Sequence, residues 1–334
     1  MAQKFAFCPL RHTLLVVGIA TTTLVAMSGS ALAQVDAWPS KPIRVVVNFP
    51  PGSSPDVLAR AIASPLQQSL GQTIVIENRA GASGMIGADV VAKAPGDGYT
   101  LLMTAGSTIS TNPFMFASIP YDTAKDLLPV GAVARIVLFL EVRPALPVKD
   151  AKAFITYLKA NPGRLSYGSA GNGSGLHIAG EMLKSQAGVN ALHVPYRGAS
   201  PALQDLLAGQ IDFFFDPGIG LGHVRADKLR LLAVASMRRS PLFPDTPTLH
   251  EIGLTGFDAG TTHGFYAPAG TPAAVVERLN RDINRALALS MVKAQIETIG
   301  ADPTPLTPLQ FAAVMAADSK RYAAIIKERG IKAD

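Results

Sequence analysis

Three features of the 334-residue chain predict an α/β fold with two domains. Short apolar runs rich in β-branched residues alternate with segments of helical periodicity, which is typical of βαβ units and mostly parallel sheets. Two blocks of this kind follow each other, near residues 43–130 and 135–250. Because 48% of the residues are hydrophobic and 16% are charged, each block is able to bury a core of its own.

The predicted strands and helix starts follow in order along both blocks. Four Ser-Pro or Thr-Pro pairs predict helix starts, with a hydroxyl N-cap before a proline at the first helical position: Ser54-Pro55, Ser200-Pro201, Thr271-Pro272 and Thr307-Pro308. We expect the helices from 272 and from 308 to return to the first domain and cover it. The predicted strands are 43–49, 73–77, 100–104, 165–169, 192–196, 211–215 and 229–236.

The first 33 residues have the features of a cleavable secretory signal peptide. Lys4 and Arg11 give a positive start, residues 14–25 are mostly apolar, and residues 31–33 form an A-x-A cleavage motif. Threonines interrupt the apolar run, which is shorter than the ~20 residues of a membrane-spanning helix. We therefore expect export to the periplasm and a mature protein that begins near Gln34.

Composition excludes several classes of function. The single cysteine, Cys8, lies in the leader, so the mature chain has no thiol for disulfides, thiol catalysis or metal binding. The histidines show no metal-ligand spacing, and we expect neither a metal nor a cofactor. The formal net charge is +6, with no basic stripe that would indicate a nucleic-acid partner. Such a mild positive charge favours recruitment of an anionic ligand.

Two strand-to-helix loops are candidates for ligand binding. In open α/β sheets, ligands bind beyond the carboxyl ends of the strands, where helix N-termini present unpaired N–H groups. The loops at 49–56 and 167–177 have this position, one in each block. Glycines in the second loop let the backbone approach a ligand and direct successive N–H groups toward an anion. The same residues are also ordinary turn formers, so a purely structural turn is an open alternative.

Two aspartates accompany these loops. Asp56 lies in the first turn of a predicted helix, where the helix dipole alone favours an acidic residue; a role in organising the ligand carries equal weight. Asp212 and Asp216 flank three phenylalanines, and the strand-end position makes Asp216 the better cleft candidate.

A secreted serine hydrolase of small esters or amides is the alternative function. The motif G-x-S-x-G requires glycine two residues before the serine, but Tyr167 precedes Ser169 and Asn172 precedes Ser174. His177 falls in the first turn of a predicted helix, where the dipole disfavours an imidazolium; we expect it to pack or to form hydrogen bonds. The chain also lacks complete nucleotide-binding fingerprints. We therefore predict ligand binding without catalysis.

Ordered strings over essentially the whole mature chain carry a resemblance to one family. They include Trp-Pro at 38–39, Asn-Arg-Ala-Gly-Ala at 78–82, Pro-Gly-Asp-Gly-Tyr-Thr-Leu at 95–101, the loop at 167–177, Val-Pro-Tyr-Arg-Gly at 194–198, Pro-Asp-Thr-Pro-Thr at 244–248 and Ala-Pro-Ala-Gly-Thr-Pro at 267–272. Together they resemble the Bug family, the periplasmic receptors of tripartite tricarboxylate transport.

The resemblance implies a two-domain periplasmic-binding-protein fold of the Venus-flytrap, type II-like kind, with a ligand cleft between the domains. We expect domain 1 at 34–131 and 255–334, and domain 2 at 132–254. The implied function is a monomeric receptor that binds a small carboxylate for sensing or for delivery to membrane subunits of a tripartite tricarboxylate transporter. The implied binding residues are Phe49, Pro51, Gly52, Ser53, Ser54, Asp56, Ala105, Gly106, Ser107, Ser169, Ala170, Asn172, Gly173, Ser174, His177 and Asp216.

Departures from the family pattern lie near the expected cleft. Ser53 stands where the family usually has a second glycine, and Pro55 is added in the same loop. Thr262 and His263 lie in a segment where the family commonly has tryptophan. Which carboxylate is bound therefore stays open at the level of the sequence.

We expect cleavage after Ala33, because residues 31–33 match the small-residue motif that signal peptidase requires. Intact-mass measurement of the protein recovered from the periplasm should give a chain that begins at Gln34. Recovery of a periplasmic chain that still carries Met1 would contradict this prediction.

Overall fold

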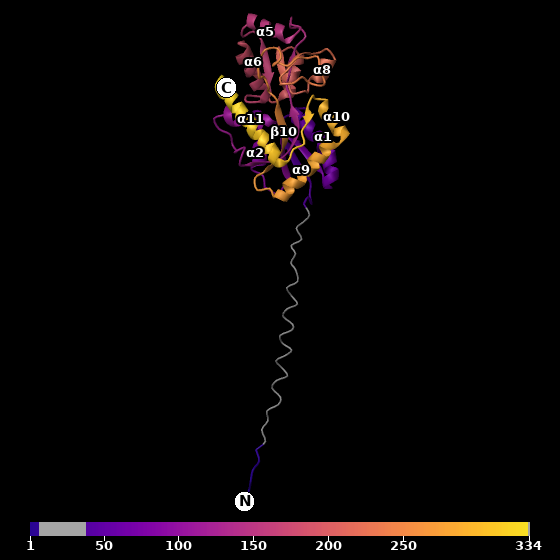
Figure 1. Cartoon of the computed structure of the whole chain (residues 1–334), viewed down its shortest axis with the longest axis vertical. Coiled ribbons are helices and arrows are strands. Elements are labelled where there is room, and N and C mark those ends of the chain that lie inside the picture. Colours follow the sequence, from indigo (N-terminus) through magenta and orange to yellow (C-terminus); the bar gives the residue numbers. More distant parts are fainter. Residues whose placement is uncertain (7–37, 333–334) are drawn as a thin grey trace. The chain divides into compact units, whose positions relative to one another are not determined.

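The computed structural model of the chain describes residues 1–6 and 38–332. The expected cleavage site at 31–33, Cys8 and the expected mature N-terminus at Gln34 lie outside the described residues. Within the described part, the strands form two sheets, and each sheet with its helices is called a lobe below (Figure 1). None of the helices in these residues combines the length and apolar character that crossing a bilayer requires.

The first lobe is built on a six-stranded sheet in the order β11-β4-β10-β3-β1-β2. Its strands are β1 (Ile43–Val47), β2 (Ile74–Asn78), β3 (Thr100–Thr104), β4 (Leu127–Ile136), β10 (Thr261–Pro268) and β11 (Asp302–Pro303). Its helices are α1 (Ser54–Leu70), the short 3₁₀ helix η1 (Ala82–Gly84), α2 (Met85–Ala92), α3 (Gly106–Ser110), α4 (Asn112–Met115), α9 (Ala273–Ala288), α10 (Ser290–Glu297) and α11 (Pro308–Arg329).

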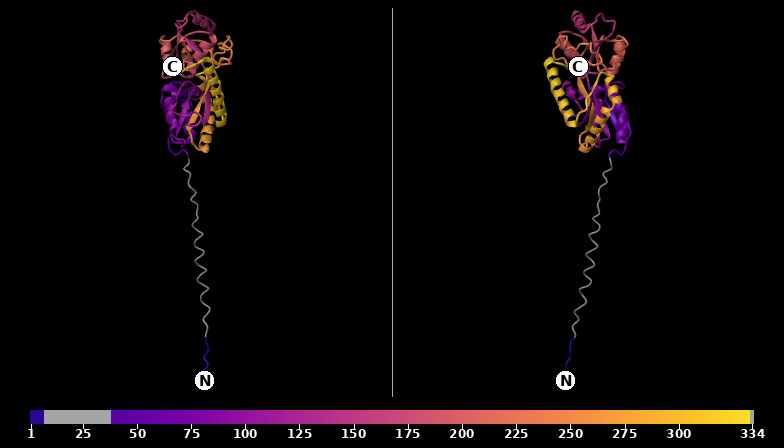
Figure 2. Two further views of the ribbon diagram at one scale, coloured as in Figure 1. Left: turned by 90° about the vertical axis from the view of Figure 1, so that its left-hand side faces the viewer. Right: turned by 45° about the vertical axis from the view of Figure 1, so that its right-hand side comes forward.

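Helices cover both faces of the first sheet. On one face, Val46, Leu102 and Tyr266 share a buried cluster with side chains of α2, α3 and α11. α1 packs together with α9 and α10, on the side away from α11 (Figure 2). The helices after residue 272 thus pack on the first lobe.

The second lobe is built on a five-stranded sheet in the order β7-β6-β8-β5-β9. Its core contains Phe213, Phe214 and Phe215, and the ring of Phe213 lies 5.1 Å from that of Phe154, edge to face. Its strands are β5 (Phe139–Val142), β6 (Ser166–Ser169), β7 (Leu192–Pro195), β8 (Phe213–Asp216) and β9 (Arg230–Val234), and its helices are α5 (Ala151–Ala160), α6 (Gly175–Ala187), α7 (Ala199–Leu207) and α8 (Leu221–Arg225).

The chain crosses between the sheets twice, over residues 137–138 and 235–260. β5 follows the first crossing and β10 the second, and both run antiparallel to their neighbours. The expectation of mostly parallel sheets is therefore wrong: parallel pairing is limited to β1 with β2 and β3, and to β6 with β7 and β8. A strand that follows a crossing enters its sheet at the end where the parallel strands terminate. It therefore runs antiparallel to those strands.

Of the four predicted helix starts, the one at 307 is confirmed at its residue. The Thr307 hydroxyl accepts from the N–H of Gln310 at 3.2 Å, and the Gln310 side chain accepts from the N–H of Thr307 at 2.9 Å. These two bonds are a capping box, which satisfies two donors that the helix itself leaves unpaired.

The other three helices begin one or two residues before the predicted positions or one after. α1 has Ser53 as its N-cap, and α7 and α9 have Gly198 and Pro272. The predicted cap hydroxyls of α7 and α9 have other partners: Ser200 donates to the carbonyl of Pro51 in the first lobe, and Thr271 to the carbonyl of Pro268. The helices themselves are present, and only the assignment of the caps was wrong.

The two lobes are packed backbone on backbone beside the loop after β8. Gly218 has a φ of +92°, and a Cβ at this position would lie 1.8 Å from the carbonyl oxygen of Ile299 in the first lobe. Only glycine therefore permits this packing of one backbone on the other.

We expect Gly218→Ala to lower the free energy of unfolding by about 1–3 kcal/mol beyond the cost of its positive φ, because the backbone of Ile299 must move. Gly209→Ala is the matched control, since Gly209 has a φ of +75° with no heavy atom within 4 Å of its added Cβ. Urea unfolding of both variants measures the difference. Equal losses in the two variants would contradict the proposed contact.

Candidate ligand-binding site

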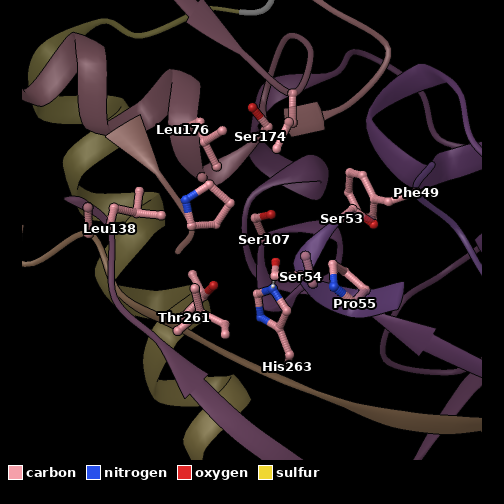
Figure 3. A pocket seen from close by; sticks show the side chains of 17 residues that line it. Phe49, Ser53, Ser54, Pro55, Ser107, Leu138, Ser174, Leu176, Thr261 and His263 are labelled. Carbon is pink, nitrogen blue, oxygen red and sulfur yellow. Dashed lines mark hydrogen bonds between the residues drawn. The ribbon is translucent and has the colours of Figure 1, made fainter. Parts of the chain in front are cut away.

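A cavity between the lobes, called the interlobe cavity below, is lined by both of them and by both crossings (Figure 3). Its volume is about 30 Å³, which is room for about two water molecules. The lining residues are Phe49, Ser53, Ser54, Pro55, Ala105, Ser107, Ile136, Leu138, Ala170, Ser174, Gly175, Leu176, Ala199, Pro217, Ala259, Thr261 and His263.

Two helices begin at this cavity from opposite lobes. α1 starts after the N-cap Ser53, and α6 starts after the N-cap Ser174, whose hydroxyl accepts from the N–H of His177 at 3.3 Å. The first N–H groups of a helix have no acceptor within it, and the helix dipole places partial positive charge there. Gly175 and Leu176, in the first turn of α6, line the cavity directly. The arrangement therefore favours an anion between the two helix starts.

The loop before α1 is held as a tight turn by its own hydrogen bonds. Ser53 donates twice to the carbonyl of Pro50, from its N–H at 3.2 Å and from its hydroxyl at 2.7 Å. Gly52 has a φ of +76°, which a left-handed turn residue requires, and its N–H donates to Asp56 at 2.9 Å. The turn brings Phe49 and Ser53 to the cavity.

Asp56 supports this turn from behind and does not line the cavity. Its carboxylate accepts hydrogen bonds from Arg60, from the N–H of Gly52 and from Asn78. Burial opposes its ionisation, but these three donors outweigh burial, so the pKa of Asp56 lies below its ordinary value. The role of this residue is to keep the loop in place as a carboxylate.

The second-lobe loop at 169–177 binds the first lobe as well as lining the cavity. The carbonyl of Gly173 accepts from the hydroxyl of Thr111 at 2.6 Å, and the carbonyl of Asn172 accepts from the hydroxyl of Ser83. The N–H of Gly173 donates to Nδ1 of His177 at 3.2 Å, within its own loop. Ala170, Ser174, Gly175 and Leu176 are the residues of this loop that line the cavity.

The predicted residues fall into two groups. The structure brings seven of the sixteen together around the cavity: Phe49, Ser53, Ser54, Ala105, Ser107, Ala170 and Ser174. The other nine lie in the surrounding turns or in the lobe interior and do not line it: Pro51, Gly52, Asp56, Gly106, Ser169, Asn172, Gly173, His177 and Asp216.

Asp216 lies inside the second lobe. One of its carboxylate oxygens accepts from the N–H groups of Gly218 and Gly220, each at 2.9 Å. Glu141, on the neighbouring strand β5, is also fully buried beside it. Burial raises the pKa of Glu141 well above its ordinary value, and burial also raises the pKa of Asp216, to about 7. Asp216 thus holds the loop 217–220, whose Pro217 forms part of the cavity wall.

Sequence reasoning missed the part of the cavity wall that comes from the crossings. Ile136, Leu138, Ala259 and Thr261 lie at the ends of the crossing segments, and none carries a chemical signal in the sequence. Their buried, mostly apolar surroundings are indistinguishable from an ordinary core in a linear pattern. His263 was noticed as a departure from the family pattern, and the structure places it at the cavity.

Two serine–histidine pairs invite comparison with a hydrolase. Ser54 Oγ lies 3.2 Å from His263 Nε2, and Ser169 Oγ lies 2.6 Å from His193 Nε2. Burial lowers the pKa of His263 to about 3, and burial, aided by the charges of His177 and Lys184, lowers the pKa of His193 to about 3. A general base works best with a pKa near the operating pH. Neither pair therefore fits the role of nucleophile and base.

Two α/β lobes joined by two crossings, with a helix start from each lobe at one interlobe cavity, define the class of two-lobed solute-binding receptors. Residues 58–331 match the tripartite tricarboxylate transporter family receptor, TctC. The chain belongs to this family. It is a receptor and not an enzyme, and its resemblance to the Bug proteins is confirmed.

Relatives and solved structures agree over nearly the whole chain. The protein BugT of Bordetella pertussis is 38% identical over 323 residues, which cover 96% of this chain and 98% of BugT. The structure of Rhodopseudomonas palustris Rpa4515 with adipate has a TM-score of 0.86 and 34% identity, and covers 88% of this chain and 99% of that one. The structure of MatC from the same organism, with bound malate, has a TM-score of 0.83 and 32% identity, and covers 86% and 100%.

The buried acid pair predicts an unusual dependence of stability on pH. The native protein keeps a proton on Asp216 up to about pH 7, whereas the unfolded chain releases it near the ordinary pKa of 3.8. The free energy of unfolding should therefore fall between these pH values, by on the order of a few kcal/mol. Because Glu141→Gln removes one of the two acids and leaves an amide donor for Asp216, this variant should lose less stability over the same range.

Urea unfolding at intervals from pH 4 to pH 9 measures this dependence. Glu297→Gln is the control, since it removes a carboxyl group from an exposed position on α10. If the profile of Glu141→Gln runs parallel to that of the unmodified protein, the acid pair does not have the proposed effect.

Proposed function

We propose that this receptor binds a small carboxylate between its lobes, with the carboxylate at the paired starts of α1 and α6. The observation that carries this proposal is the convergence of these two helix starts, one from each lobe, on a single cavity. Hydrogen bonds to a charged group contribute about 1.5–3 kcal/mol each, and donors at a helix start need little reorganisation to form them.

The neighbours with ligands support a carboxylate. The structure of Rpa4515 contains adipate and that of MatC contains malate. Adipate and malate are both small carboxylates. The loops around the cavity lie within the matched parts of this chain, and residues 58–331 match the receptor family. The shared ligand chemistry agrees with the two helix starts described above.

Closure of the lobes about the two crossings is the second part of the proposal. The cavity of about 30 Å³ is too small to admit an acid of four or more carbons while the lobes keep these positions. Three contacts join the lobes around it: Ser200 to Pro51, Ser83 to Asn172, and Thr111 to Gly173. Rotation at 137–138 and 235–260 separates these contacts and opens the cavity, as in hinge motions of other two-domain receptors.

The cellular role follows from the family. We propose that the mature receptor works in the periplasm as a monomer and presents its carboxylate to membrane subunits of a tripartite tricarboxylate transporter or to a sensor. The leader predicted at residues 1–33 supports export. The match to the receptor component of this transporter family supports the partner.

Thermal melting with a panel of mono-, di- and tricarboxylates tests ligand binding directly. A ligand that binds only the native state adds about 2.7 kcal/mol to the free energy of unfolding at 100 times its Kd, so the melting temperature should rise with its concentration. A panel in which no acid raises the melting temperature would contradict the proposal.

Gly175→Ala should weaken the binding of whichever acid stabilises the protein, by about tenfold or more, because the added methyl group occupies the cavity. Its Cβ would lie 3.7 Å from Ser107 across the cavity, an ordinary contact that leaves the fold intact. Gly222→Ala, on α8 with no atom within 4 Å of its Cβ, is the matched control and should bind as the unmodified protein does. Calorimetric titration measures the affinities of both variants. Equal affinities would show that the ligand does not bind in this cavity.

A further inference from the structure

The interlobe cavity contains almost no ionisable side chain. Among the described residues that line it, none is Asp, Glu, Lys or Arg. The acids nearest to its loops are engaged elsewhere: Asp56 is bonded to Arg60 and Asn78, and Asp216 accepts from Gly218 and Gly220. A charge on the part of the ligand that packs against this lining would therefore be buried without a lining side chain of opposite sign, which is costly.

His263 is the single titratable side chain of the lining, and its hydrogen bonds define its tautomer. Its Nδ1 accepts from the N–H of Gly106 at 3.4 Å. In a neutral imidazole the other nitrogen then carries the proton, so Nε2 donates to Ser54 Oγ at 3.2 Å. The ring is 3% exposed, and burial lowers its pKa to about 3, so it is uncharged at neutral pH.

The tautomer of His263 decides what Ser54 offers to a ligand. Because Ser54 Oγ accepts from the imidazole, its own proton is directed to another acceptor. Ser54 lines the cavity next to the start of α1, and Figure 3 shows it beside His263. The chain of bonds from Gly106 through His263 thus orients Ser54 as a donor toward the cavity.

The wall opposite Ser54 is apolar. Figure 3 shows Leu138 and Leu176 on one side of the cavity and Ser53 and Ser54 on the other. Ile136 and Pro217 add further apolar surface to the lining. Such a wall stabilises hydrocarbon by burial, at about 25 cal/mol for each Å² removed from water.

We propose that the ligand is a monocarboxylate with a compact, uncharged and mainly apolar body that carries one hydrogen-bond acceptor. Its carboxylate lies at the starts of α1 and α6, its body packs against Leu138 and Leu176, and its acceptor receives the proton of Ser54. His263 acts as a positioning residue that sets this specificity. The inference rests on the carboxylate site proposed above and narrows it, since dicarboxylates and α-amino acids carry a second charge that this cavity does not match.

Calorimetric titration of acids with matched or closely related carbon frames tests the inference. One set is 4-methylpentanoate, 4-methyl-2-oxopentanoate and leucine; the others are hexanoate with adipate and benzoate with terephthalate. Within each set, the monocarboxylates without a second charge should bind about 100-fold more tightly than the acid that carries one, which is leucine, adipate or terephthalate. A diacid or an amino acid as the tightest binder would overturn the inference and leave the proposed carboxylate site standing. A panel in which no acid binds would overturn the carboxylate site itself.

Ser54→Ala tests the donor. The variant should bind 4-methyl-2-oxopentanoate, whose body carries an acceptor, about tenfold more weakly. It should bind 4-methylpentanoate, which lacks that acceptor, with nearly unchanged affinity. Ser64→Ala, an exposed position on the same helix, is the control and should change neither affinity. Melting curves of both variants report whether the fold is kept. Equal weakening of both acids in a folded Ser54→Ala variant would overturn the role assigned to Ser54 and His263.

Discussion

The backbone N–H groups at the starts of α1 and α6 are the constraint on which the rest of the site depends. An anion in a dry cavity needs donors, and this cavity has no cationic side chain to supply them. The main chain and neutral hydroxyl groups then supply the donors, and the main-chain donors come from two helices that begin at one cavity from different lobes. The serine caps, the turn held by Asp56 and the loop at 169–177 all maintain that geometry.

Neutral polar groups take a larger part here than charged ones. Ser53, Ser54, Ser107, Ser174 and Thr261 line the cavity, while Asp56 and Asp216 stabilise loops behind it. Hydroxyl groups donate or accept according to their neighbours, so a buried partner such as His263 decides which they do. Polarity of the site is therefore set by residues that themselves carry no net charge.

Local chemistry in the sequence predicted β1 to β3, β6 to β9, both loops and the helices α1, α6, α7, α9 and α11. Glycine, proline and hydroxyl residues mark strand-to-helix turns in a single stretch of chain, which is why Phe49, Ser53 and Ser174 were found. β4, β5 and β10 were missed because they are buried along most of their length and show no alternation. The contributions of Ile136 and Leu138 to the cavity wall were therefore not predicted either, since only tertiary packing brings these residues to the cavity.

The last helix adds a property that the cavity alone does not have. α11 packs on α3 and β4 of the first lobe, and it also contacts α6 of the second lobe, where the buried Ile331 follows its end. The lobe rotation proposed above would remove this contact, so the free energy of the contact would favour the closed form whether or not the cavity is filled. A larger closed fraction of the empty receptor raises the apparent affinity for every ligand by the same factor. Affinity can therefore change through α11 during evolution without any change in specificity.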